Sequence, residues 1–279
     1  MLDKLRRTYS IVRKLGGGEF GDIYLGVNKN TDRNVAIKVG EDIDGILINN
    51  EAKVYNVLGD EKGFPKMRLY GREDNYSYIV MDLLGISLSK KKEEEGSFNI
   101  NEVVRVGIII LRKLEILHNK GYLHRDMKPD NIMYGLDQDK DVYLIDYGLS
   151  CGYIRGGVHV ENERTGRMIG TTRYASINLH NGYRPTRRDD IEGLGYVLLY
   201  LLVDKLPWQD IGGEDDAKRL KMVKKIKEDE NLLDIYKELP IELLGIINYA
   251  RKLKYNEKPN YDYLVGLLKN LQEIIHKST

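Results

Sequence analysis

One short loop constrains this chain more than any other segment, the run HRDMKPDN from His124 to Asn131. It places a carboxylate at Asp126, an amine at Lys128 and an amide at Asn131 close together in the chain. The carboxylate can accept the proton of an incoming hydroxyl, the amine can reach a transferred phosphoryl group, and the amide oxygen can hold a metal ion. The alternative is a polar loop in which Pro129 stops a helix. A chance match at all of these positions is improbable, so the run predicts phosphoryl-transfer chemistry.

Composition bounds the chain without deciding its function. Its 279 residues suffice for one large domain or for two lobes that share a cleft. Lys+Arg (44) and Asp+Glu (43) nearly cancel, so no strong basic field points to nucleic acid or to an anionic membrane. The single cysteine, Cys151, excludes an internal disulfide framework and fits a reducing compartment.

No segment has the pattern of a membrane or export signal. Residues 1–7 carry charges where a signal peptide needs an apolar core, and the longest apolar run, 194–203, is far below the ~20 residues that cross a bilayer. Basic residues within 218–225 predict a solvated helix face, with nuclear import as the alternative. We expect an intracellular protein, cytoplasmic or nuclear, that neither inserts into a membrane nor binds nucleic acid.

The apolar pattern changes character part-way along the chain. Alternation predicts strands over residues 9–15, 22–27, 34–39, 66–70 and 76–81, with one helix over 46–58. Later segments predict helices over residues 103–117, 191–203, 216–227, 241–253 and 261–275. We therefore predict an α+β fold with two lobes of one domain, a small β-rich N-lobe over residues 1–84 and a larger α-helical C-lobe over residues 85–279.

A glycine cluster lies between the first two predicted strands, in the run GGGEFGDI that starts at Gly16. Missing side chains at Gly16, Gly18 and Gly21 let backbone N–H groups approach phosphate oxygens closely. A dinucleotide-binding loop would lead from a strand into a helix, whereas here a second strand follows. The pattern predicts a hairpin that covers phosphates, and an ordinary glycine-rich turn is the alternative.

Lys38 lies on the third predicted strand, within the run VAIK. A lysine on a strand is usually a solvent-facing charge. The helix that follows offers Glu51, which would hold the amine against the α- and β-phosphates of a nucleotide. Glu41 and Asp42 are competing partners, but they lie in the connecting loop, where no helix fixes their position. We predict the pair Lys38–Glu51.

The run Asp146-Tyr147-Gly148 follows a predicted strand over residues 141–145. A carboxylate at the carboxyl end of a strand is well placed to hold Mg²⁺ that bridges nucleotide phosphates. An ordinary turn is the alternative, but the position of the run shortly after Asn131 favours a metal site. Phe is usual in the middle of such a run, and Tyr147 adds a hydroxyl that needs a partner.

Together these motifs resemble those of protein kinases, and the chain is similar to the casein kinase 1 family in particular. Most specific is Ser176-Ile177-Asn178, where most protein kinases carry Ala-Pro-Glu and this family carries Ser-Ile-Asn. The resemblance extends from Tyr9 to about Leu271. The runs that carry it are residues 18–26, 81–85, 128–131, 170–178, 187–198, 206–209 and 258–264.

The resemblance implies a serine/threonine protein kinase with the two-lobed kinase fold, ATP and Mg²⁺ as cofactors, and protein substrates. The catalytic residues would be Asp126 as base, with Lys128, Lys38 and Glu51. The metal would be held by Asn131 and Asp146. The nucleotide would contact Gly16, Gly18, Gly21, Ile23, Ala36, Lys38, Met81 as gatekeeper, Asp82 and Leu84, and a residue near Ile145 would help to enclose the ring. Asp190 would support the catalytic loop, and His124 would brace it.

The resemblance also implies substrates with acidic or phosphorylated residues, a monomer, and activity without phosphorylation of the activation segment. Basic side chains beside that segment select such substrates in this family, and Arg173 and Lys221 match two of the positions. Two departures oppose recognition of a phosphate, namely Cys151 in place of the usual lysine and the acidic run at residues 214–216. Whether priming by phosphate is required therefore stays open. Arg164 and Arg167 offer positive charge that would compensate for these two departures.

Two other classes of protein were weighed. A small-molecule kinase such as an aminoglycoside or choline phosphotransferase would share the catalytic carboxylate and asparagine, but would not be expected to carry Lys128-Pro129 together with residues 176–178. A pseudokinase that acts as a binding module would normally have lost Lys38, Asp126, Asn131 or Asp146, and all four are present. An active protein kinase is the prediction.

Overall fold

The computed structural model describes residues 2–18, 21–137, 141–166, 168–211, 215–229 and 239–278. They belong to two compact units, which are considered one at a time. Met1–Ser87 and Ile132–Ser150 form the first, here called the sheet unit, and Leu88–Asn131 and Cys151–Thr279 form the second, the helical unit. The α+β class is confirmed. The division of lobes at residues 84 and 85 stays a prediction.

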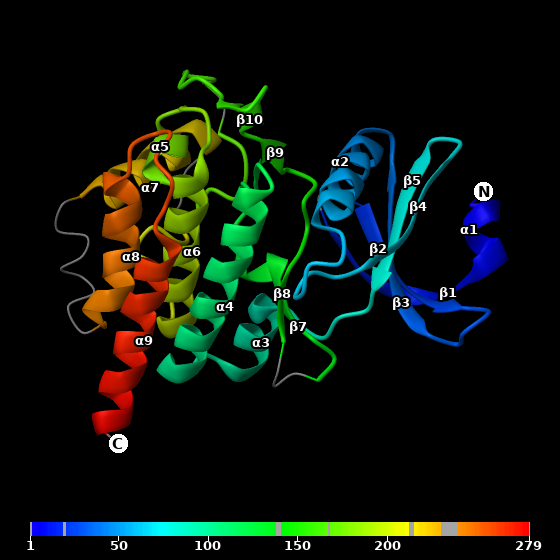
Figure 1. The fold of residues 1–279 in the computed structure, drawn as a ribbon, viewed down its shortest axis with the longest axis horizontal. Coiled ribbons are helices and arrows are strands. Elements are labelled where there is room, and N and C mark those ends of the chain that lie inside the picture. The colour runs from blue at the N-terminus through cyan, green and yellow to red at the C-terminus, as the bar shows by residue number, and fades with distance from the viewer. Residues whose placement is uncertain are drawn as a thin grey trace. The chain divides into compact units, whose positions relative to one another are not determined.

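A five-stranded antiparallel sheet forms the sheet unit, with strand order β1-β2-β3-β5-β4 (Figure 1). All five strands overlap the segments that alternation predicted, and each is a residue or more longer. Their bounds are β1 Tyr9–Gly18, β2 Gly21–Asn28, β3 Asn34–Glu41, β4 Met67–Glu73 and β5 Tyr76–Asp82. The predicted helix is α2, Asp42–Leu58, and a short hairpin of β7, Ile132–Tyr134, and β8, Val142–Leu144, completes the unit.

The side chains on one face of β3 belong to an apolar core, and the side chain of Lys38 lies on the opposite face. Val35, Ile37 and Val39 are buried in an apolar cluster with Tyr78 of β5. Because successive side chains of a strand point to opposite faces, Lys38 lies on the face away from this cluster. The sequence pattern of β3 therefore separates the packing residues from the residue predicted to act on a nucleotide.

A short first helix, α1 (Asp3–Thr8), was not predicted. Its free N–H groups are satisfied by β4, since the Glu73 carboxylate accepts from Lys4 N at 3.0 Å and from Leu5 N at 3.1 Å. Leu5 is fully buried in the apolar cluster of the sheet. A carboxylate at the helix N-terminus and a buried leucine thus stabilise a helix too short to form by propensity alone.

The helical unit contains the helices that the long apolar segments predicted. Within it α4, α6, α8 and α9 pack against one another (Figure 1). The helices are α3 Leu88–Glu95, α4 Ile100–Asn119, α5 Ile177–His180, α6 Arg187–Leu202, α7 Asp216–Glu228, α8 Ile241–Lys252 and α9 Tyr261–Ser278. Short strand pairs lie at β6 Tyr122–Leu123 with β9 Cys151–Gly152 and at β10 Ile154–Arg155 with β11 Val158–His159. A 3₁₀ turn, η1, spans Pro129–Asn131.

Helix α6 is buried along most of its length and carries buried acids. Its N-terminus is closed by a capping box, in which the Thr186 and Asp189 side chains each accept from the other's backbone N–H. Asp189, Asp190 and Glu192 are all buried. Because buried carboxylates need hydrogen-bond partners, these three mark where α6 supports loops.

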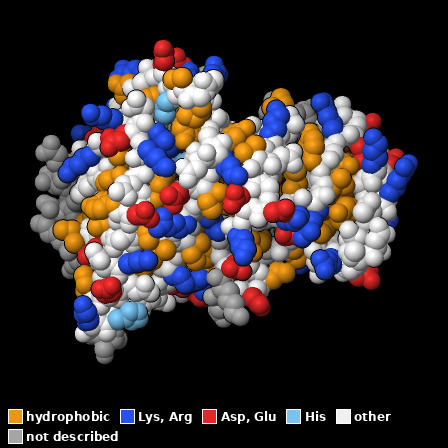
Figure 2. All heavy atoms as spheres, viewed as in Figure 1, with side chains coloured by type: hydrophobic (Ala, Val, Ile, Leu, Met, Phe, Trp, Pro, Cys, Tyr) orange, Lys and Arg blue, Asp and Glu red, His pale blue; other side chains and the backbone are white. Residues whose placement is uncertain are grey.

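The surface carries mixed charge. On the face drawn in Figure 2, Lys and Arg side chains are interspersed with Asp and Glu over the helical unit. Among the described residues, no helix is both long enough and apolar enough to cross a membrane.

Candidate active site

Lys38 is held between two carboxylates inside the sheet unit. Its Nζ lies 2.7 Å from Glu51 Oε2 and 2.9 Å from Asp146 Oδ1. Burial works against the charge of Lys38, but the two carboxylates outweigh it, so the pKa of Lys38 is raised. Burial also raises the pKa of Glu51, against the opposing effect of Lys38. The structure thus forms the predicted pair and adds Asp146 to it.

The turn after β8 places Asp146 in this cluster. Asp146 has a positive φ of 64°, and its Oδ1 accepts from Lys38 Nζ. Asn50 of α2 fixes the turn, because its Nδ2 donates to the carbonyl oxygens of Gly148 and Ser150, both at 2.8 Å. The hydroxyl of Tyr147 finds its partner in Leu144 O at 2.7 Å. Sequence reasoning missed Asn50, although its place beside Glu51 on the same helix was a usable signal.

The glycine cluster forms the end of the β1–β2 hairpin, with Gly16 opposite Ile23 and Gly18 opposite Gly21. Gly21 is required by the backbone itself, since its φ is 110° and a Cβ would lie 2.4 Å from Val39 O. A Cβ on Gly16 would meet nothing within 4 Å. The backbone conformation therefore requires glycine at position 21. At position 16 the described structure leaves room for a side chain, so the close approach of a ligand is what would account for glycine there. Two members of the motif, Glu19 and Phe20, lie outside the described residues.

The predicted adenine-contacting side chains share one face of the sheet with Lys38. Ile23 is directly opposite Lys38 across β2 and β3, and Ala36 is directly opposite Met81 across β3 and β5. Directly opposed side chains point to the same face, and so do residues two apart on one strand. Asp82 uses its carboxylate elsewhere, accepting from Arg68 of β4, which leaves its backbone as the predicted contact. Leu84 follows β5 and is half-buried.

In the helical unit, Asp126 is buried and its carboxylate is held by three side chains. Lys128 Nζ lies 2.8 Å from Oδ2, and Asn131 Nδ2 lies 3.2 Å from the same oxygen and 2.9 Å from the Asp126 carbonyl. Thr171 donates to Oδ1 from its N at 3.0 Å and from its Oγ1 at 2.7 Å. The three predicted loop residues are therefore together, and Thr171 is an addition that the sequence did not indicate.

Asp190 of α6 supports the backbone of this loop. Its carboxylate accepts from His124 N and from Arg125 N, each at 2.8 Å, and contacts His118 Nε2 at 2.9 Å. Burial opposes the charge of Asp190, but these hydrogen bonds outweigh it, so the pKa of Asp190 is lowered. His124 is fully buried and its Nδ1 accepts from Asp126 N at 3.3 Å, as expected for a bracing residue.

A glycine-rich hairpin, a paired strand lysine and a loop with a fixed carboxylate are thus all present. A family model described as "Protein kinase domain" matches residues 9–265. The chain belongs to the protein kinase family. It is therefore a protein kinase, and members of this family in general use ATP and Mg²⁺.

The residues present in this kinase fit Mg²⁺. Magnesium takes oxygen ligands and is usually held by one or two carboxylates together with phosphates of the substrate. Among the residues described here, no group of three or more His, Cys, Asp or Glu side chains is placed to hold a metal ion. In Asn131 the amide nitrogen is the half engaged with Asp126, so the oxygen is the half suited to a cation. Asn131 belongs to the helical unit and Asp146 to the sheet unit.

The kinase's two predicted anion-binding cations occupy different elements of the helical unit. Arg173 is half-buried, and its guanidinium lies 5.8 Å from the ring centroid of Tyr200. Lys221 is exposed on α7. Among the described residues, no hydrogen bond or ion pair joins Arg173 to Lys221.

Cys151, Asp215 and Arg164, which bear on the expected recognition of a phosphate, all lie in the helical unit. Cys151 is half-buried at the start of β9, and burial raises the pKa of its thiol. Asp215 is the N-cap of α7, where its Oδ1 accepts from Ala217 N at 3.0 Å. The Arg164 guanidinium lies 4.9 Å from the ring centroid of Tyr183. Arg167 and Glu214 lie outside the described residues, and so does the side chain of Asp216.

Proposed function

We propose that this protein kinase transfers the γ-phosphoryl group of ATP to serine or threonine residues of acidic or phosphate-primed protein substrates, as casein kinase 1 enzymes do. The observation that carries the substrate class is the place of Arg173. It follows two residues after Thr171, whose hydroxyl contacts Asp126, and two residues span at most about 7 Å of chain. Arg173 therefore lies close enough to Asp126 for one bound peptide to contact both the guanidinium and the carboxylate that would accept its hydroxyl proton.

In the proposed reaction, the substrate oxygen forms a bond to the γ-phosphorus, the bond from that phosphorus to the β–γ bridging oxygen breaks, and ADP leaves. Asp126 accepts the hydroxyl proton. Lys128, at 2.8 Å from Asp126, places a positive charge beside the reacting groups. The hydrogen bonds from Thr171 and Asn131 hold the carboxylate in one orientation, which is the protein's main contribution to such a step.

The sheet unit would orient the nucleotide. Lys38, held by Glu51, would contact the α- and β-phosphates, and the sheet face that carries Ile23, Ala36 and Met81 would receive the adenine ring. Mg²⁺ held by Asn131 and Asp146 would neutralise phosphate charge. We further propose that this kinase acts as a monomer inside the cell, in the cytoplasm or the nucleus, for which the single cysteine and the balanced charge are the support.

The test uses radiolabelled ATP and matched peptides. One peptide carries phosphoserine three positions before the target Ser, the second carries Asp there, and the third carries Ala. We expect the first two to be phosphorylated with the higher kcat/KM, and more so at low salt, because charge-assisted contacts are screened. Charge reversal by Arg173→Glu and Lys221→Glu together should remove the preference.

A matched control for charge reversal is Lys225→Glu, an exposed lysine on the same helix as Lys221. It should keep the preference. Equal kcat/KM for all three peptides in the native kinase would contradict the substrate class. Transfer to tyrosine peptides only, or to a small alcohol such as an aminoglycoside and not to peptides, would contradict the proposed reaction.

A further inference from the structure

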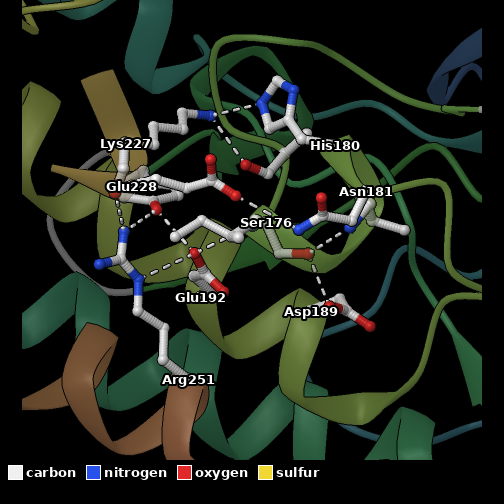
Figure 3. A network of polar contacts seen from close by, with 12 residues as sticks. Ser176, His180, Asn181, Asp189, Glu192, Lys227, Glu228 and Arg251 are labelled. Carbon is white, nitrogen blue, oxygen red and sulfur yellow. Dashed lines mark hydrogen bonds and ion pairs between the residues drawn. The ribbon is translucent and has the colours of Figure 1, made fainter. Parts of the chain in front are cut away.

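A buried lysine that the reaction does not use lies beside the activation segment. Lys227 of α7 is fully buried in the helical unit. Its Nζ donates to Ala175 O at 2.7 Å and to Thr172 O at 3.0 Å, and lies 3.2 Å from His180 Nε2. Figure 3 shows the Lys227 side chain extended toward His180 within a network of polar contacts.

Lys227 is enclosed by two aromatic rings. Its Nζ lies 4.7 Å from the ring centroid of Tyr196 and 5.1 Å from that of Trp208, which favours the amine, whereas loss of water on burial lowers the pKa of Lys227 well below its ordinary value. Its hydrogen-bond partners among the described residues are two carbonyls and an imidazole. A buried amine needs such partners to persist, so its place in the fold is tied to the segment that supplies the carbonyls.

Other buried side chains hold the same segment. Trp208 Nε1 donates to Arg173 O at 2.8 Å, and Glu192 Oε1 accepts from Ile177 N at 3.2 Å. Glu192 is itself fixed, because Arg251 Nε lies 3.3 Å from Oε1 and the Tyr196 hydroxyl donates to it at 2.6 Å. Figure 3 shows Glu192 and Arg251 facing each other in this network. The backbone from Thr172 to Ile177 is thus held by side chains of α6, α7 and the loop after α6.

Arg173 lies between the two carbonyls that Lys227 binds. We propose that Lys227 is a positioning residue that sets the preference for acidic substrates, by fixing the backbone on either side of Arg173. This inference rests on the proposed function. Without Lys227, the guanidinium is presented in several orientations, so an acidic substrate loses more than a neutral one does.

The experiment compares Lys227→Met with Lys225→Met. Both remove an amine from the same helix, but Lys225 is exposed. The readouts are kcat and KM for the Asp peptide and the Ala peptide, KM for ATP, and hydrogen exchange of the amides of residues 171–177. In Lys227→Met we expect the ratio of kcat/KM between the two peptides to fall about tenfold, the size of one charge-assisted contact. We expect KM for ATP to stay unchanged and the amides to exchange faster. Lys225→Met should behave as the native kinase.

Lys227→Gln keeps an N–H donor on a shorter side chain and serves if Lys227→Met does not fold. In Lys227→Gln the ratio of kcat/KM between the Asp peptide and the Ala peptide should also fall, but by less than in Lys227→Met. An unchanged peptide ratio in both Lys227 variants would overturn the proposal, and so would equal losses of kcat on both peptides with an unchanged ratio, since that pattern indicates a structural role only. If the native kinase shows no peptide preference, the proposed substrate class fails instead. Faster amide exchange confined to the Lys227 variants would then still support positioning of the segment, and unchanged exchange would refute it.

Discussion

Thr171 donates two hydrogen bonds to one oxygen of Asp126, from its N at 3.0 Å and from its Oγ1 at 2.7 Å. The preceding residue, Gly170, has a φ of 94°, and a Cβ there would lie 2.3 Å from Arg125 O. The activation segment therefore approaches the catalytic loop so closely that only glycine fits at this point. Within the helical unit, the orientation of the Asp126 carboxylate therefore depends on the conformation of the backbone at Gly170 and Thr171.

Removing the Thr171 hydroxyl should slow catalysis with little effect on nucleotide binding. Thr171→Val keeps the shape of the side chain and loses the 2.7 Å contact to Asp126. We expect kcat to fall about tenfold to a hundredfold, the range for losing a charge-assisted hydrogen bond that orients a reacting group. Steady-state kinetics with varied ATP and peptide measures this. Thr31→Val, the same change at an exposed turn, should leave kcat as it is, and a native kcat in Thr171→Val would show that the contact is dispensable.

The Lys38 cluster makes a prediction about stability. Lys38→Met should abolish use of ATP and also destabilise the fold, by about 3–5 kcal/mol, because it leaves the buried Glu51 carboxylate without its cation. Adding Glu51→Gln removes that uncompensated charge and should restore part of the lost free energy of unfolding, though none of the activity. Urea unfolding of the single and double variants measures the effect. A double variant less stable than Lys38→Met would contradict the account.

Asp189 should contribute stability that is lost as pH rises toward neutrality. Burial raises the pKa of Asp189 from 3.8 to about 7, so the folded protein binds a proton there that the unfolded chain releases. This contribution is fully present below pH 3.8 and is lost as pH rises through 7, at up to about 1.4 kcal/mol per pH unit. Asp189→Asn cannot titrate, so the difference in unfolding free energy between the native and variant proteins should shrink or reverse sign from pH 4 to pH 7.

The comparison with the variant is needed because His180 titrates with the opposite effect. Burial and Lys227 lower the pKa of His180 from 6.5 to about 3. Its contribution to stability is present above 6.5 and is lost as pH falls toward 3. In the native protein the two slopes oppose each other in the acid range, whereas Asp189→Asn should show the acid loss alone. A pH-independent difference between the native protein and Asp189→Asn would show that Asp189 is ionised in the fold.

Activity should not depend on phosphorylation of the activation segment. The backbone from Thr172 to Ile177 is held by Lys227, Trp208 and Glu192, none of which needs a phosphate. Protein made in bacteria should be active at once, and treatment with a phosphatase should leave kcat unchanged. Loss of activity on phosphatase treatment, or a need for an upstream kinase, would contradict this expectation.

Sequence reasoning succeeded where the determining contacts are local or follow a strict period. Alternation was enough to place Lys38 on the third strand, and a helical position was enough to prefer Glu51 over Glu41. It missed α1, because the group that caps this helix, Glu73, lies far away in the chain. The contacts of α1 are set by the sheet, and no pattern within six residues contains them.

The basic helix α7 shows the same limit. The sequence predicts a solvated face for the basic residues within 218–225, and Lys221 and Lys225 are indeed exposed. Lys227, two residues on, is fully buried. Its burial depends on Tyr196 and Trp208, which arrive from α6 and the loop after it. Local composition cannot distinguish a lysine that faces water from one that faces the activation segment, because only tertiary packing separates them.

In the proposed reaction, the Asp126 carboxylate is the base that accepts the proton of the peptide hydroxyl during phosphoryl transfer. The most direct test measures kcat for the Asp-containing peptide with radiolabelled ATP in the native kinase, in Asp126→Asn and in Asp130→Asn. The two substitutions are chemically the same and lie in one loop, but Asp126 is buried among its donors whereas Asp130 is exposed. The account predicts that Asp126→Asn folds and loses about 10²–10⁴-fold in kcat, while Asp130→Asn retains native turnover. Native turnover by a folded Asp126→Asn protein would contradict it.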